Sequence, residues 1–172
     1  PVIDGRGIEP DLEVELPDLS RLSAMLLVKH HIFNFATQYT QQHPEIQAPT
    51  LFKLSSQDYA DFKKFVLAQE NFDYTTASEE ALKKMKTTAE KEGYYQDIAT
   101  DYEQMLIKVT PSKERDLDKF EQEIRELLEE EIMTRYYYQE GRAKHSLQTD
   151  PVVLKGIEIL QAPSQYNTIL KK

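Results

Sequence analysis

The first clear pattern of hydrophobic and polar positions lies at residues 12–16, where apolar and acidic side chains alternate. This two-residue period predicts a β-strand with its apolar residues on one face. No second strand pattern follows, and a lone strand leaves its backbone donors and acceptors unpaired. We therefore expect residues 1–16 to be the last strand and turn of a sheet that belongs to a larger protein, and residues 17–172 to form a helical domain.

From residue 17 onward, apolar residues recur at intervals of three and four, the spacing that places them on one face of a helix. The pattern predicts a mainly α fold, a helical bundle-like domain of five or six helices preceded by one short orphan β-strand. The expected helices are 18–42, 55–69, 76–93, 94–108, 110–140 and 150–161. We expect a frayed tail from residue 161 to residue 172.

Capping residues mark several of these helix ends. Thr76 begins a Ser/Thr-x-x-Glu capping box, and Gly93 is a typical C-terminal stop. Asp150 provides a capping side chain ahead of Pro151 at the first helical position. The range 110–140 would be the longest helix, about 45 Å at 1.5 Å per residue. The residues of the last helix that are expected to face the core are Val153, Ile157 and Leu160.

Composition narrows the classes of function. The 172 residues carry a net charge of -9, and this acid excess argues against nucleic acid, whose phosphates require basic patches. The chain has no cysteine and no Cys/His zinc spacing, which excludes disulfide scaffolds, structural zinc and cysteine nucleophiles. No apolar run approaches the roughly 18–20 residues of a membrane span. Nothing in the sequence implies a cofactor.

Two groups of residues resemble metal or catalytic sites, and each has a plainer interpretation. His30 and His31 are adjacent, so on a helix their side chains diverge by about 100° and cannot bind one metal ion together. Residues 129–131 are three consecutive glutamates, which fan out along a helix rather than converge. A solvated helix face explains these glutamates better than a cation site or a pair of catalytic carboxylates.

A run of three tyrosines is the candidate partner surface. Tyrosine is amphipathic and is enriched at protein interfaces. One helix face cannot bury Tyr136, Tyr137 and Tyr138 together, so at least one of them should be exposed. The alternative is that the tyrosines fill a groove between helices, and the sequence leaves both interpretations open.

The segment ahead of the helices resembles a known motif. Residues 4–11 read Asp-Gly-Arg-Gly-Ile-Glu-Pro-Asp and precede the alternating strand. This resembles the Gly-x-Gly-Ile-x-Pro-Asp segment that closes the catalytic domain of carboxyl-terminal processing, or tail-specific, serine proteases. Residues 150–160 are similar to the closing Asp-Pro helix of that family, although Gly156 stands where alanine is usual. The motif positions are Gly5, Gly7, Ile8, Pro10 and Asp11.

The resemblance implies that the chemistry lies upstream of Pro1. The parent protein would carry a PDZ-like substrate-binding domain and a Ser/Lys dyad, with the lysine as general base. Within this chain, residues 76–79 superficially resemble the family's nucleophile segment, and Lys108 lies thirty residues beyond Ser78. The capping box explains the first segment, and Lys108 lacks flanking glycines. We therefore assign no catalytic residue and no metal ligand to the chain.

These observations predict a non-catalytic C-terminal helical domain of a serine endopeptidase, which scaffolds or regulates the upstream protease core. Its partners would be the protease and PDZ-like domains of the same parent chain, and the exposed strand would offer a site for homodimerisation. The long helical tail is similar to that of envelope proteases of Bacteroides-like bacteria, which implies the periplasm or cell envelope. The alternative is a free-standing helical module that binds a protein partner through its tyrosines and long helix.

Overall fold

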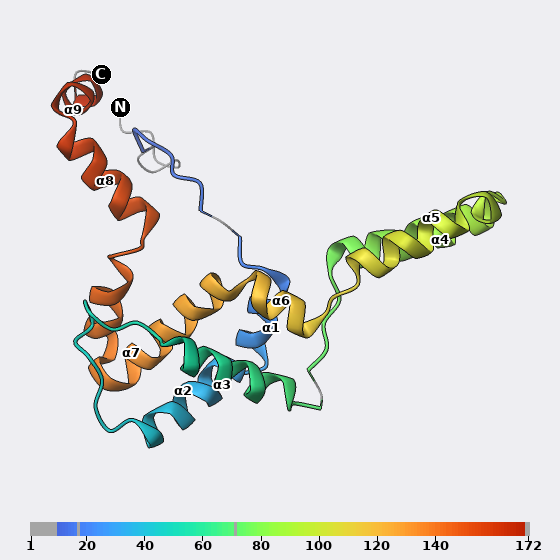
Figure 1. Cartoon of the computed structure of the whole chain (residues 1–172). Coiled ribbons are helices and arrows are strands. Elements are labelled where there is room, and N and C mark those ends of the chain that lie inside the picture. Colours follow the sequence, from blue (N-terminus) through green and yellow to red (C-terminus); the bar gives the residue numbers. More distant parts are fainter. Residues whose placement is uncertain (1–9, 17, 71, 171–172) are drawn as a thin grey trace, which may run out of the picture.

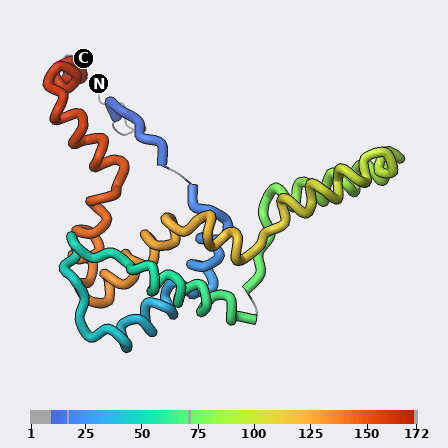
Figure 2. Tube along the Cα trace, in the orientation of Figure 1, coloured from blue at the N-terminus to red at the C-terminus, as the bar shows by residue number. Residues whose placement is uncertain are grey.

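The computed structural model describes residues 10–16, 18–70 and 72–170, and within these ranges every regular element is a helix (Figure 1). Five helices build the core, two project from it as an arm, and the last two leave it on another side (Figures 1 and 2). The described helices are α1 (Arg21–Val28), α2 (His31–Gln42), α3 (Ser56–Leu67), α4 (Ala77–Glu92), α5 (Tyr95–Val109), α6 (Lys113–Lys119), α7 (Glu121–Ser146), α8 (Pro151–Gln161) and α9 (Pro163–Leu170).

The expected strand at 12–16 is wrong, because no strand occurs in the described part of the chain and these residues run without regular structure. An alternating pattern forms a strand only when a second strand accepts its backbone hydrogen bonds. The segment lies instead against α8 and α9. A homodimer through an exposed strand therefore has no strand to form it within the described residues.

Two of the expected helices are each divided in two, so the described chain has more helices than the five or six predicted. The range 18–42 turns at His30, whose φ of 60° lies in the left-handed region, and yields α1 and α2. The range 110–140 breaks at Phe120 into α6 and α7. Both breaks fold apolar residues on either side onto one core, and neither position carries a glycine or proline. The tail expected to fray contains α9.

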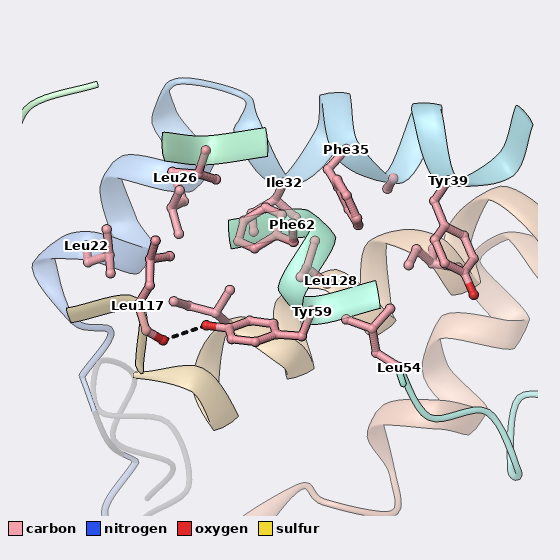
Figure 3. Packing of buried hydrophobic residues seen from close by; sticks show 14 of the residues in the cluster. Leu22, Leu26, Ile32, Phe35, Tyr39, Leu54, Tyr59, Phe62, Leu117 and Leu128 are labelled. Atoms are coloured by element: carbon pink, nitrogen blue, oxygen red, sulfur yellow. Dashed lines mark hydrogen bonds between the residues drawn. The ribbon is translucent and has the colours of Figure 1, made fainter. Parts of the chain in front are cut away.

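The core lies between α1, α2, α3, α6 and α7 (Figure 3). Its centre includes a buried hydroxyl, because Tyr59 of α3 donates a hydrogen bond to the carbonyl oxygen of Leu117 at 2.6 Å. Burial raises the pKa of Tyr59, and the hydroxyl therefore stays a donor. The fully buried apolar side chains include Leu22, Leu26, Ile32, Phe62, Leu117, Ile124, Leu128 and Ile132.

Helices α4 and α5 form a hairpin that projects from the core as an arm (Figure 1). The predicted ends are confirmed. The Thr76 side chain accepts a hydrogen bond from the N–H of Glu79, and Gly93 ends α4 with a φ of 82°. Leu82 of α4 and Tyr102 of α5 are buried in the seam between the two helices. The arm thus has a narrow apolar seam of its own, separate from the main core.

Candidate functional site

Helix α7 bends sharply at Tyr138, where φ is 54° and ψ is -157°. In a straight helix, residues 129 and 145 would lie about 24 Å apart, because each residue adds 1.5 Å. Here Nε2 of His145 lies 3.0 Å from Oε2 of Glu129. An ion pair between Arg142 and Glu130 crosses the same bend at 2.9 Å. The bend therefore folds the end of α7 back toward its middle.

Glu129 is the centre of a buried polar cluster, with only 3% of the residue exposed. Its carboxylate accepts hydrogen bonds from the backbone N–H of Leu54 at 2.8 Å and from Nζ of Lys53 at 3.2 Å. The other ring nitrogen of His145 lies 2.9 Å from the carbonyl oxygen of Pro49. The cluster joins α7, its bent end and the loop between α2 and α3. The solvated face expected for the glutamates is wrong for Glu129, because the bend covers it.

Beyond the bend, α8 and α9 expose apolar side chains. Asp150 caps α8 as predicted, since its side chain accepts hydrogen bonds from the N–H groups of Val152 and Val153. The inward face expected for Ile157 and Leu160 is wrong, because both are exposed, Leu160 by 66%. The exposed large apolar residues on the two helices are Val152, Leu154, Ile157, Leu160, Tyr166 and Leu170. These helices therefore present a surface that the core does not cover.

The described N-terminal segment lies on the same side of the core as α8 and α9 (Figures 1 and 2), and its residues line a groove together with theirs. A groove of about 390 Å³ opens between the segment and both helices. Leu12 and Val14 line the groove from the segment, and Ile159 and Ile169 line it from α8 and α9. We call the groove and the exposed apolar residues of α8 and α9 the terminal surface. It brings together the two ends of the described chain, which the sequence places far apart.

The family-motif residues divide at the edge of the described chain. Gly5, Gly7 and Ile8 lie outside the described residues. Pro10 and Asp11 are exposed, and Asp11 lines the groove of the terminal surface. The role predicted for this motif stays a prediction.

The three tyrosines lie at the bend, Tyr136 and Tyr137 directly before it and Tyr138 at the bend itself. The Tyr136 hydroxyl donates to the carbonyl oxygen of His43, and the Tyr137 hydroxyl donates to that of Ile46 at 3.3 Å. Both rings pack against the core, and burial raises the pKa of Tyr136. Tyr138 is 78% exposed. A partner contact at the tyrosines stays a prediction, and Tyr138 is the ring that is available for it.

The remaining candidates for chemistry are dispersed. Ser78 lies in the first turn of α4 and Lys108 near the end of α5, and both are exposed to solvent. In the part of the chain that the structure describes, no group of three or more His, Asp or Glu side chains is placed to hold a metal ion. No described helix is both long and apolar enough to cross a membrane.

One protein-family model, described as the C-terminal helical domain of a probable PDZ-protease, matches residues 22–160. The chain belongs to this family. No curated protein and no solved structure matches this PDZ-protease helical domain. The family match begins in α1 and ends in α8, so the bent α7 and its buried cluster lie within the matched region. The domain is therefore an all-helical part associated with a probable protease.

Proposed function

We propose that this domain is the non-catalytic scaffold of a carboxyl-terminal processing serine endopeptidase, and that its terminal surface binds the protease core of the same parent chain. The observation that carries the proposal is that residues 11–14 run along the exposed apolar face of α8 and α9. A core that precedes residue 10 in the chain would be tethered beside this face. The family match and the motif resemblance at residues 4–11 support a protease as that core.

The exposed apolar area of α8 and α9 would supply the binding energy. Burying an exposed leucine, isoleucine or valine side chain contributes about 1.5–3 kcal/mol. Contiguous apolar patches on soluble proteins mark contact surfaces. Because the contact would form within one chain, the linker supplies a high effective concentration and little affinity is needed. The buried Glu129–His145 pair would hold the bent end of α7, and with it α8, in the orientation for binding.

In this proposal the catalytic serine and lysine lie upstream, and the domain positions the core rather than acting on substrate. We also propose that the parent protein works in the periplasm or cell envelope of a bacterium. The support for this location is the family resemblance.

The test uses the parent chain. Determining the gene sequence upstream of Pro1 should reveal several hundred residues that include a Ser/Lys pair and a PDZ-like domain. Within that parent, Leu160→Glu should lower thermal stability and peptidase activity, because a carboxylate would be buried in the contact. Ile107→Glu is the matched control, since Ile107 is also exposed but lies on the arm. In the 172-residue chain both variants should leave stability unchanged. Equal effects of the two variants in the parent would contradict docking at the terminal surface.

A second candidate is a free-standing helical interaction module. The observations that favour it are that the arm projects away from α8 and α9 (Figure 1) and that Tyr138 is exposed. A start codon and signal peptide directly before Pro1 would support this alternative, and an upstream Ser/Lys protease domain would exclude it.

A further inference from the structure

His31, the first residue of α2, has a buried side chain whose polar atoms lack partners. The residue is 8% exposed, and neither ring nitrogen has a hydrogen-bond partner in the described part of the protein. The ring packs edge-to-face against Phe72, with centroids 4.9 Å apart, and against Phe65 at 6.3 Å. An apolar box of this kind tolerates a neutral imidazole far better than a charged one.

Phe72 anchors the place where the arm leaves the core. It is fully buried and belongs to the connection between α3 and α4. Close by, the Tyr74 hydroxyl donates to Oδ2 of Asp116 at 2.6 Å, and Lys113 pairs with Asp73 at 3.2 Å. These contacts tie the beginning of the arm to α6. A movement of Phe72 would therefore also move residues 73–76 and the beginning of α4.

The charges around the box favour a neutral ring inside it and a charged ring outside it. The Nζ atoms of Lys29 and Lys113 each lie 5.8 Å from the centroid of Phe72. Burial, with a smaller effect of Lys29, lowers the pKa of His31 below its ordinary value of 6.5. Helix α3 contributes the uncharged Phe65 to the box. A surface depression beside His31 is lined by Lys29, Gln69 and Glu70, so a carboxylate lies on its outer side.

We propose that His31 is an acid-sensitive switch at the base of the arm. When the ring takes a proton from solvent, it leaves the Phe65–Phe72 box and turns toward Glu70, where the imidazolium can donate a hydrogen bond. Phe72 then loses the closer of its two aromatic partners, His31 and Tyr74, and the connection that carries the arm loosens. The switch is independent of the proposed docking at the terminal surface.

The direction of the pH dependence follows from linkage. The unfolded chain binds a proton at His31 near pH 6.5, whereas the folded chain binds it only at lower pH. Stability from His31 is therefore complete above pH 6.5 and is lost as the pH falls through and below that value, by up to about tenfold in the folding equilibrium per pH unit.

The test measures hydrogen exchange of the whole chain at pH 7.5 and at pH 5.5, expressed as protection factors that correct for the intrinsic effect of pH. Protection of the N–H groups of Phe72, Glu79 and Glu80, which donate hydrogen bonds to Gln69 and to Thr76, should fall at pH 5.5 in the wild type. In His31→Phe, which keeps an aromatic ring but cannot titrate, protection should be nearly the same at both pH values.

His30→Asn is the matched control, because His30 is an exposed neighbour and asparagine tolerates its left-handed backbone. This variant should keep the wild-type response. Glu70→Gln should reduce the loss of protection, since the outward ring would lack its carboxylate partner. A wild-type loss spread evenly over all helices, or an equal loss in His31→Phe, would overturn the proposal. Should His31→Phe fold poorly, the NMR titration of the His31 ring provides the second measurement, and an apparent pKa at or above 6.5 would also overturn it.

Discussion

The buried carboxylate of Glu129 makes a large and specific contribution to stability, and Glu129→Ala tests it. The substitution leaves the N–H of Leu54 and the ring of His145 without their acceptor. Leaving a buried donor without its acceptor costs about 1–3 kcal/mol. Two such donors, the Leu54 N–H and a ring nitrogen of His145, lose the same carboxylate. We therefore expect a loss of about 2–6 kcal/mol in the free energy of unfolding.

Glu130→Ala is the control, because it makes the same chemical change one residue further along α7. Glu130 pairs with Arg142 at a partly exposed site, and such pairs contribute about 0–1 kcal/mol. The assays are urea unfolding and thermal unfolding at pH 7.5, both followed by circular dichroism at 222 nm. For a chain of this size, each kcal/mol shifts the Tm by about 2–4 °C, so Glu129→Ala should lower the Tm by about 4–24 °C.

A buried role for the Glu129 carboxylate would be refuted if the free energies of unfolding of the two alanine variants differed by less than about 0.5 kcal/mol, which is the usual range for surface substitutions. A double-mutant cycle with His145→Ala adds a second criterion. Since each single substitution already breaks the same contact, the double variant should lose much less than the sum of the two single losses. Additive losses would mean that Glu129 and His145 do not interact.

Two further predictions concern the bend in α7. A Cβ on Gly141 would lie 2.0 Å from the Cβ of Tyr137, so Gly141→Ala should destabilise the domain by about 1–3 kcal/mol. Gly156→Ala, where a Cβ would meet nothing within 4 Å, should stabilise the domain by about 0.5–1 kcal/mol. If urea unfolding showed stability changes of the same sign for both alanine variants, the close contact between Gly141 and Tyr137 would be contradicted. Tyr138 has a backbone conformation that strongly favours glycine, so Tyr138→Gly should raise stability by about 1 kcal/mol. A lower urea midpoint for Tyr138→Gly would show that the exposed ring makes a stabilising contact.

Local signals in the sequence were sufficient for several helix ends. Thr76, Gly93 and Asp150 have the roles that their residue types predict, because a capping side chain or a left-handed glycine acts within a few residues of the chain. The helical class followed from the spacing of apolar residues for the same reason. The family motif at residues 4–11 indicated a protease context, and the family match agrees with that context at the level of a probable PDZ-protease.

The errors have one physical cause, which is that contacts between distant residues override local pattern. The alternation at 12–16 is a real pattern, but a strand forms only beside a partner strand. In this structure the neighbours of the segment are α8 and α9, which are helices. His30 and Tyr138 adopt positive φ values although neither is glycine, because the turns they make bring buried side chains together. The residue type at neither position predicts a turn.

The sequence by itself determined the helical class, the helix ends at Thr76, Gly93 and Asp150, and the association with a protease, since these depend on residue types at short spacing. Only the tertiary structure decided that Glu129 is buried rather than solvated, that His31 has no polar partner, and that the apolar face of α8 and α9 lies beside residues 11–14. Each of these facts depends on a turn of the chain that joins residues far apart in sequence. The energy that stabilises such a turn comes from the contacts it creates, so the turn cannot be inferred from the residues at the turn alone.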